Sequence, residues 1–403
     1  MRILILTQVY YPDTVSVSQH LTDISKHFAT EGHQVEVITS KYPYEDKDTS
    51  YPVNEELDGV KITRVWQTKF GKKTIIHRLL DYFTFNLIIG LKFLLKRKDF
   101  DLVFVSTSPP FLSFITTLIC KIRNIPVYFW VMDLQPELSI ASGLIKEKSF
   151  SARFFSVIGN YSIRRASKLI SLDRFMTKYL ISRGGRPEDI VTTPVWPVIE
   201  GNYDGDRLSN PFRKANNFGD KIVIMYSGNH AYVHPLDTLL KVAEKLRNDD
   251  RFLFVFVGGG VRKIDVTEFK NKHKLDNIIQ LPFQPRDQIK YSLSSADIQV
   301  VILGDGQVGY THPNKVYGAL FVGRPVLYIG PKESHVSDIL NQIPGNISIE
   351  HSEIEELKNC LEVFARLMDE EKLEIGRLNK SYAFSNLDPK LLMKNISEYL
   401  NKY

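Results

Sequence analysis

Hydrophobic residues occur along the chain in short runs, most of them rich in β-branched or aromatic side chains, separated by segments with amphipathic patterning. The runs are typical of buried strands, and segments such as 18–33, which ends at Gly32, are typical of amphipathic helices. Their alternation favours parallel sheets covered by helices on both faces. The predicted strands form two series: residues 2–6, 34–39, 102–107, 127–132 and 168–172, then 221–228, 252–260, 278–283, 298–303 and 325–330.

Residues 193–220 separate the two series and are rich in Pro, Gly, Asn and Asp. A chain of 403 residues is also too long for one ordinary core. We therefore predict an α/β protein with two doubly wound parallel-sheet (Rossmann-like) domains in tandem. The first covers 1–195, a linker covers 196–220, and the second covers 221–387. Ligands of such sheets bind beyond the carboxyl ends of the strands.

The composition is that of a folded globular protein, with 43% hydrophobic and 24% charged residues. The net charge of +6 suits anionic partners such as nucleotides or an acidic membrane surface, and it is too small to favour a nucleic-acid-binding protein. Cys120 and Cys360 are far apart, which favours neither a disulfide framework nor a zinc site. The start of the chain resembles a strand rather than a signal peptide, and no apolar run is long enough to span a membrane. These features predict a cytoplasmic protein.

Two loops after predicted strands of the second half are candidates for a ligand site. Gly228, Asn229 and His230 end one strand, and the glycines that include Gly258 and Gly259 end the next. Glycines after a buried strand allow close approach to a phosphate, ribose or base. The spacing does not match G-x-G-x-x-G, so a plain tight turn remains the alternative.

The segment THPNKVYGAL, residues 311–320, combines a polar turn with a helix start. Backbone N–H groups are unpaired at a helix start, and Lys315 adds a positive charge there, so the segment suits an anion. His312, Asn314 and Tyr317 cluster around the same point. A surface helix capped by Asn314 is the alternative.

In the first half, Asp133 directly follows a buried strand. A carboxylate in that position can act as a base or hold a sugar hydroxyl, although an Asp that caps a turn would occur in the same place. The polar residues nearby, or on the loop after the first strand, are Gln135, Glu137, Ser16, Ser18 and Gln19.

Residues 72–98 predict a helix with a broad apolar face and basic ends. A basic amphipathic helix suits an anionic membrane surface, and an ordinary buried helix is the alternative. The basic residues are Lys72, Lys73, His77, Arg78, Lys92, Lys96, Arg97 and Lys98.

Taken together, these segments resemble the family-4 glycosyltransferases of the GT-B fold. The branch that they resemble most builds colanic acid, exopolysaccharide and O-antigen. The motifs that carry the resemblance are YYPDTVSVSQHL, GHQVEVIT, VMDLQPE, MYSGNHAYVHPLDTLL, FVGGG, LPFQPRDQIKYSLSSADIQVV and VGYTHPNKVYGALFVGRPVLYIGP.

The resemblance implies a glycosyltransferase without a cofactor or metal, since helix N-termini and basic side chains neutralise the leaving diphosphate. It implies a nucleotide-sugar donor, UDP- more than GDP-, on the second domain, and a saccharide acceptor, polyprenyl-linked, on the first. It also implies a retaining reaction and a last helix, residues 388–403, on the first domain. The catalytic candidates are Asp133, His230 and Lys315. The donor-binding candidates are Ser16, Gly228, Asn229, Gly258, Gly259, Phe283, Gln284, His312, Asn314 and Tyr317, and the acceptor-side candidates are Ser18, Gln19, Gln135 and Glu137.

The sequence departs from the family pattern at its charged positions. Tyr310 and Gly318 stand where the family carries two glutamates, the second of which commonly holds the ribose. Asn229 and His230 replace a usual Arg and Lys, and the family's catalytic histidine is absent near Asp133. These departures leave open a non-hydrolysing sugar-nucleotide epimerase and an inactive nucleotide-sugar-binding relative. The sugar, the acceptor and the oligomeric state are open as well.

Overall fold

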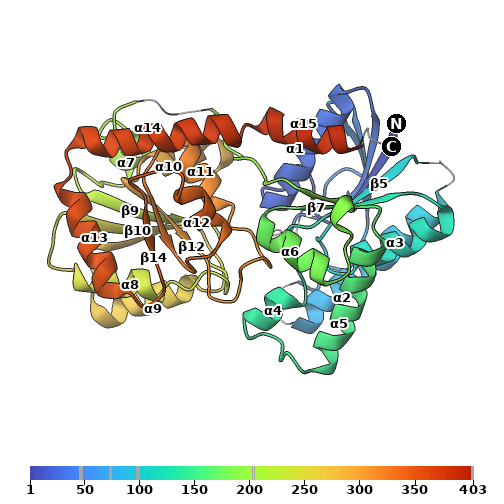
Figure 1. Cartoon of the computed structure of the whole chain (residues 1–403), viewed down its shortest axis with the longest axis horizontal. Helices are drawn as coiled ribbons and strands as arrows, with labels where there is room; N and C mark the ends of the chain where they lie inside the picture. The colour runs from blue at the N-terminus through green and yellow to red at the C-terminus, as the bar shows by residue number, and fades with distance from the viewer. Residues whose placement is uncertain (45–48, 72–74, 97–99, 202, 204, 401–403) are drawn as a thin grey trace. The chain divides into compact units, whose positions relative to one another are not determined.

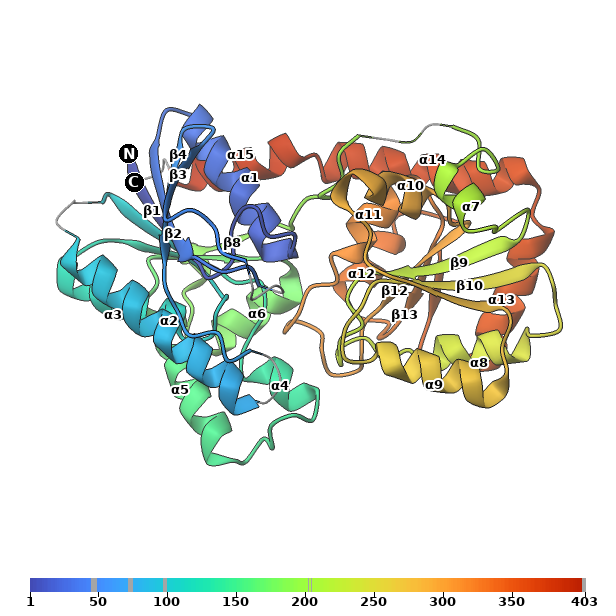
Figure 2. The same ribbon diagram turned by 180° about the vertical axis from the view of Figure 1, so that it is seen from behind.

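The computed structural model describes residues 1–44, 49–71, 75–96, 100–201, 203 and 205–400. The chain forms two compact units (Figures 1 and 2). Unit 1 comprises Met1–Val195, Gly309–Thr311 and Lys390–Tyr403, and unit 2 comprises Trp196–Val308 and His312–Pro389. Each unit contains one sheet. Every strand predicted from the sequence is present in one of the two sheets. The predicted fold class, two parallel-sheet α/β domains, is therefore confirmed.

The sheet of unit 1 has eight strands in the order β3-β4-β2-β1-β5-β6-β7-β8. All neighbours are parallel except β3 and β4, which are antiparallel. The sequence analysis missed β3, β4 and β8, because the first two form a polar edge hairpin and β8 has only three residues. The strands are β1 (Arg2–Leu6), β2 (Gln34–Ser40), β3 (Asn54–Leu57), β4 (Val60–Val65), β5 (Leu102–Ser106), β6 (Val127–Trp130), β7 (Lys168–Ser171) and β8 (Ile190–Thr192).

The helices of unit 1 include α2, α3 and α5, which lie together because α3 packs against both of the others (Figures 1 and 2). No helix in the described part of the chain is long and apolar enough to cross a membrane. The helices are α1 (Ser16–Thr30), α2 (Ile75–Leu95), α3 (Leu112–Arg123), α4 (Glu137–Ala141), α5 (Phe150–Arg165), α6 (Arg174–Ser182), the 3₁₀ turn η1 (Pro187–Asp189) and α15 (Pro389–Leu400).

The sheet of unit 2 has six parallel strands in the order β11-β10-β9-β12-β13-β14. The strands are β9 (Ile222–Ser227), β10 (Phe252–Val257), β11 (Ile278–Leu281), β12 (Ile298–Ile302), β13 (Val326–Ile329) and β14 (Ile347–Ile349). The helices are α7 (Pro211–Ala215), α8 (Asp237–Lys245), α9 (Lys263–His273), η2 (Arg286–Gln288), α10 (Ile289–Ser294), α11 (Lys315–Phe321), α12 (His335–Leu340), α13 (Ile354–Arg366) and α14 (Asp369–Asn386).

The order of strands reverses at one point in each sheet. In unit 2, β9 lies between β10 and β12, and in unit 1, β1 lies between β2 and β5. Loops leave the carboxyl ends of the strands in opposite directions at such a point, which opens a crevice suited to a ligand. We call the loops at the carboxyl ends the mouth of each sheet. They include residues 7–15, 107–111 and 131–136 in unit 1, and 228–236, 258–262 and 303–308 in unit 2.

The segment predicted as a linker belongs to unit 2 from Trp196 onward. The buried guanidinium of Arg213 donates to Ser295 O (2.8 Å) and to Asp297 Oδ2 (3.2 Å). The side chain of Asn210 donates to Tyr291 O (3.1 Å). The end of this segment is thus fixed to the second sheet and its helices.

The last helix, α15, lies in unit 1 from Lys390 onward. The hydroxyl of Tyr399 donates to Glu188 O (3.2 Å), and the ammonium of Lys168 lies 5.3 Å from the centre of the Tyr399 ring. The chain therefore returns to the first sheet at its carboxyl end.

Candidate functional site

Two neighbouring loops at the mouth of unit 2 touch through their backbones, and only glycine permits this. A Cβ atom at Gly258, where φ is +125°, would lie 2.2 Å from Gly228 O. A Cβ atom at Gly260 would lie 2.3 Å from Asn229 Oδ1. The backbone N–H of His230 donates to Gly259 O (2.7 Å). The glycines that we predicted to approach a ligand therefore allow close contact between the loop after β10 and residues 228–230.

An aromatic ring covers these glycines. The ring of Phe283 lies 3.3 Å from the position of a Cβ atom at Gly258 and 3.0 Å from that at Gly259. Phe283 is about half exposed, so one face of its ring is open to a ligand. The Gln284 amide donates to Pro282 O (2.9 Å), which fixes the turn that carries the ring.

Lys315, the first residue of α11, lies against the β9 loop. Its Cε lies 2.8 Å from the position of a Cβ atom at Gly228, and its Nζ lies 5.1 Å from the centre of the Tyr226 ring. No carboxylate in the described part of the chain pairs with this ammonium. Burial lowers the pKa of Lys315 to about 7, because the charged form loses water and gains no opposite charge. An anion bound at this point would supply the opposite charge that the Lys315 ammonium lacks.

His230 differs from the prediction that it supplies positive charge beside Lys315. Its ring is buried, and this burial lowers its pKa below the ordinary value, so the imidazole is neutral near pH 7. Its Nδ1 lies 3.2 Å from Gly259 O and donates to it. Among the described residues Nε2 has no partner, so it can accept a hydrogen bond from a hydroxyl group.

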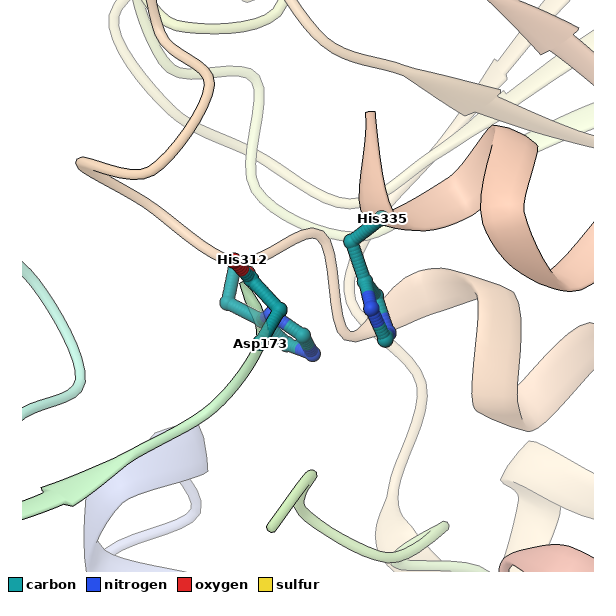
Figure 3. A group of neighbouring side chains, drawn as sticks. All are labelled: Asp173, His312 and His335. Carbon is teal, nitrogen blue, oxygen red and sulfur yellow. The ribbon is translucent and has the colours of Figure 1, made fainter. Parts of the chain in front are cut away.

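The residues around the start of α11 also differ from the prediction. Tyr317 is fully buried, and its hydroxyl lies between Nε2 of His312 and Nε2 of His335, 2.6 Å from the latter. The two imidazole rings lie side by side, with their centres 4.2 Å apart (Figure 3). Asn314 makes no side-chain capping bond to the helix. Tyr317 therefore binds two histidines instead of facing a ligand, and Lys315 begins a helix of only seven residues.

At the mouth of unit 1, Asp133 is half-buried and held in place. Its backbone N–H donates to Thr107 Oγ1 (3.3 Å), and its Oδ1 accepts from Thr311 Oγ1 (2.7 Å). The next N–H, of Leu134, donates to Tyr310 O (2.9 Å). Residues Gly309–Thr311, which belong to unit 1, thus orient the carboxylate.

Most of the acceptor-side candidates make local contacts that stabilise the fold. Ser18 is buried and donates to Asp13 O (2.9 Å), and the Gln19 amide donates to Thr14 O (2.6 Å). Glu137 is buried in an ion pair with Arg183 (3.3 Å). These bonds occupy the Ser18 hydroxyl, the Gln19 NH2 group and the Glu137 carboxylate, which we had expected to face an acceptor, whereas Oε1 of Gln19 has no partner among the described residues.

The two remaining candidates of unit 1 are exposed. Gln135 accepts a hydrogen bond from Ser139 (2.6 Å). Ser16, predicted to bind the donor, lies in unit 1 at the start of α1 with its Oγ 3.3 Å from Nδ1 of His20.

The basic residues of the predicted membrane helix are not all available to a membrane. Lys96 forms an ion pair with Glu36 of β2. Lys72, Lys73, Arg97 and Lys98 lie outside the described residues. The helix α2 also exposes apolar side chains, and its contact with a membrane stays a prediction.

The sequence analysis also missed a cavity in unit 1, lined by residues that include Gln8, Gln67, Lys69 and Arg78. These residues come from three segments that are distant in sequence. No local pattern marks them as one site, although Gln8, two residues after the end of β1, was a usable signal.

Comparison with known proteins places both units in one enzyme class. Residues 17–196 match the glycosyl transferase 4-like domain, and residues 209–309 match the glycosyl transferases group 1 domain. The chain is 22% identical over 341 residues to the glycosyltransferase WbjE of Pseudomonas aeruginosa, covering 82% of this chain and 80% of that protein. It is 22% identical over 371 residues to the colanic acid biosynthesis glycosyl transferase WcaI of Escherichia coli K12, covering 89% and 90%.

Solved structures show the same fold. The Anabaena protein HepE in complex with UDP-glucose has a TM-score of 0.74 at 13% identity, with both chains covered completely. WaaG, a glycosyltransferase involved in lipopolysaccharide biosynthesis, has a TM-score of 0.69 at 14% identity, covering 98% of this chain and 99% of that one. The chain therefore belongs to the two-domain glycosyltransferases of the GT-B fold, with a glycosyl transferase 4-like domain followed by a group 1 domain.

Proposed function

We propose that this glycosyltransferase moves a sugar from a UDP-sugar to a lipid-linked saccharide during the synthesis of a bacterial surface polysaccharide, without a metal ion and with retention of configuration. The observation that carries the proposal is the ammonium of Lys315, which lies at the mouth of unit 2 with no carboxylate partner among the described residues. A desolvated cation without a counter-ion destabilises a protein, and such a group is typical of a binding or catalytic site.

The donor is assigned to the mouth of unit 2. Lys315 contacts the diphosphate, and the open face of Phe283 lies against the base. The unpaired Nε2 of His230 accepts from a ribose or sugar hydroxyl, which substitutes for the glutamates absent at Tyr310 and Gly318. UDP is favoured because HepE, of the same fold, was solved with UDP-glucose.

The chemical step needs little from the protein besides charge and position. The bond between the anomeric carbon and the diphosphate oxygen breaks, and a bond from that carbon to an acceptor oxygen forms. Lys315 stabilises the negative charge that develops on the departing diphosphate. The acceptor proton passes to Asp133 or to the departing phosphate oxygen, and Thr311 keeps the Asp133 carboxylate in place.

The acceptor assignment rests on the relatives and on α2. WcaI is described as a colanic acid biosynthesis enzyme and WaaG as a lipopolysaccharide enzyme, and both polymers belong to the cell surface. The exposed apolar side chains of α2 suit peripheral contact with a membrane that carries a lipid-linked acceptor.

The test is incubation of the protein with a panel of radiolabelled nucleotide sugars and a bacterial membrane extract, with and without a chelator. We expect label in the lipid fraction from a UDP-sugar, unchanged by the chelator. Conversion of the free nucleotide sugar without lipid product would instead indicate an epimerase, and binding without either product would indicate an inactive relative.

A further inference from the structure

A cavity of about 60 Å³ opens in unit 1 beyond the carboxyl ends of β1, β2 and β4, beside the start of α2. Its walls include Gln8, Tyr42, Gln67, Lys69 and Arg78, and Asp133 does not line it. The cavity has room for a few water molecules, which suits a phosphate group better than a sugar ring.

The charges in the cavity favour an anion. Lys69 lies 4.0 Å above the ring of Tyr42, and the Arg78 guanidinium donates to the hydroxyl of Tyr82 (2.7 Å). No carboxylate in the described ranges pairs with Arg78. A guanidinium with donors to spare, beside a second cation, matches the geometry of a phosphate group.

One carboxylate also lines the cavity, but its oxygens are occupied. Asp81 accepts from Thr68 Oγ1 (2.7 Å), Phe70 N (2.9 Å) and Gly71 N (2.8 Å). It therefore fixes the turn that carries Lys69, and it does not pair with Arg78.

A buried amide in the wall points independently to a polar ligand. Gln8 is only 6% exposed, and its Nε2 donates to Gln67 Oε1 (3.0 Å). Its Oε1 has no partner within the described residues. If both amides were turned over, Nε2 of Gln8 would be the unpaired atom instead. Either way a buried hydrogen-bonding group is left for a ligand, because such groups are rarely left unsatisfied.

The helix that supplies Arg78 continues from the cavity as an apolar track. Phe85, Ile89 and Phe93 are buried in unit 1, yet the opposite side of α2 is apolar as well. A helix that is hydrophobic on all sides requires an apolar partner on each side. The exposed residues are between 41% and 76% exposed and begin directly after Arg78: Leu79, Leu80, Phe83, Leu87, Leu91, Leu94 and Leu95.

We propose that this cavity binds the phosphate group that joins the acceptor saccharide to its lipid, and that the lipid chain lies along the exposed face of α2. The inference rests on the proposed function, since it names how that acceptor is held. A molecule with a phosphate group next to a long apolar chain matches a cavity with cations in its lining and exposed apolar side chains beside it.

The test is calorimetric titration of the full chain with farnesyl diphosphate, farnesol and isopentenyl diphosphate, in the presence of UDP so that the mouth of unit 2 is occupied. The intact protein should bind farnesyl diphosphate at least tenfold more tightly than farnesol. Arg78→Gln and Lys69→Gln should each weaken farnesyl diphosphate binding about tenfold or more, since each removes a charge-assisted contact. Lys92→Gln, near the other end of α2, is the matched control and should change nothing.

A second pair of variants tests the apolar track. Phe83→Gln combined with Leu87→Gln should weaken binding of farnesyl diphosphate but not of isopentenyl diphosphate, whose chain is too short to reach along α2. Val363→Gln, an exposed apolar residue of α13, serves as control. The same thermal unfolding midpoint in all variants would show that none acts through folding.

The outcomes separate this inference from the proposed function. Equal binding of farnesol and farnesyl diphosphate, no binding of either, or affinity unaffected by Arg78→Gln and Lys69→Gln would overturn the inference while UDP binding stands. Failure of the protein to bind any nucleotide sugar would overturn the proposed donor, and loss of farnesyl diphosphate binding in Arg78→Gln would still support the phosphate site.

Discussion

The mouths of the two sheets share a topology but differ in the chemistry that they present. In unit 2 the mouth includes closely packed glycine loops and the ammonium of Lys315, with which no described carboxylate pairs. Around the sheet of unit 1, three basic side chains are paired with carboxylates: Arg64 with Glu55 (2.7 Å), Lys168 with Asp189 (2.7 Å) and Arg183 with Glu137 (3.3 Å). Lys315 differs from these side chains in having no carboxylate partner among the described residues.

The difference has a physical cause. The attraction within an ion pair offsets at least part of the desolvation cost of its two charges, whereas a desolvated amine without a counter-ion bears that cost uncompensated. A protein keeps such an amine where a ligand supplies the missing charge. In the proposed function, unit 2 therefore binds a nucleotide diphosphate common to many reactions, and unit 1 recognises an individual acceptor through side chains. Each prediction below tests one side of this contrast.

The largest expected effect is on the side of unit 1. Asp133→Asn should lower turnover by about 10²–10⁴-fold, the usual range for the loss of a positioned acid or base. UDP affinity should stay the same, because Asp133 lies in the other unit. Steady-state rates with a UDP-sugar and titration with UDP measure the two quantities.

Thr311→Val is the matched control for Asp133. It removes the hydrogen bond to Oδ1 but keeps the carboxylate, so turnover should fall by about tenfold only. Normal turnover in Asp133→Asn would mean that the residue merely fixes the loop, and both sheets would then lack an identified base.

The next effect concerns the backbone contact in unit 2. Gly258→Ala should reduce the free energy of unfolding by about 3 kcal/mol, because its Cβ would collide with Gly228 O and φ is positive. UDP affinity should fall with it, since residues 228–230 would shift. Denaturant unfolding and UDP titration give both values.

The variant Gly306→Ala separates the cost of a positive φ from the cost of a steric clash between the loops. Gly306 also has a positive φ, +75°, but a Cβ atom there would have no neighbour within 4 Å. We expect a loss of about 1 kcal/mol. Equal losses in the two variants would show that the contact between the loops is unimportant.

The fold and the candidate site differ in how far the sequence predicts them. The strands were predictable because each is a run of buried apolar residues. Lys315 and Gly258 could be singled out because each follows such a strand or turn, and their contact with a ligand stays a prediction. Ser18, Glu137 and Tyr317 were assigned to ligands but bind Asp13, Arg183 and His335. A polar side chain at a mouth has the same local pattern whether its partner is a ligand or the protein.

The third effect concerns the ammonium of unit 2. Lys315→Met keeps the length of the side chain and removes its charge, so UDP should bind about 10- to 150-fold more weakly, the effect of losing a charge-assisted hydrogen bond of about 1.5–3 kcal/mol. Uridine binding should change little. An equal loss for UDP and uridine in parallel titrations would show that Lys315 supports the loop and not the phosphate.

A smaller effect should appear in the pH dependence of UDP affinity. The pKa of Lys315 is about 7 in the free protein, and a bound diphosphate should raise it. Below pH 7 the amine is charged in both states. Above pH 7 UDP binding must take up a proton, so affinity should fall by up to about tenfold for each pH unit until the pKa of the complex is reached.

Calorimetry in two buffers with different enthalpies of ionisation measures that proton. At pH 8 we expect uptake of close to one proton for each UDP bound, and none in Lys315→Met. Proton uptake that persists in the variant would assign the effect to another group.

The smallest effect separates charge from apolar contact on α2. Lys96 pairs with Glu36 on the partly buried side of the helix, so Lys96→Gln should lower the free energy of unfolding by no more than about 1 kcal/mol and leave binding to anionic vesicles unchanged. Phe83→Gln should do the opposite, because Phe83 is 65% exposed: stability stays the same and vesicle binding weakens. Denaturant unfolding and vesicle sedimentation test both variants. If Lys96→Gln releases the protein from vesicles and Phe83→Gln does not, then unit 1 contacts the membrane through charge and not through the exposed apolar side chains of α2.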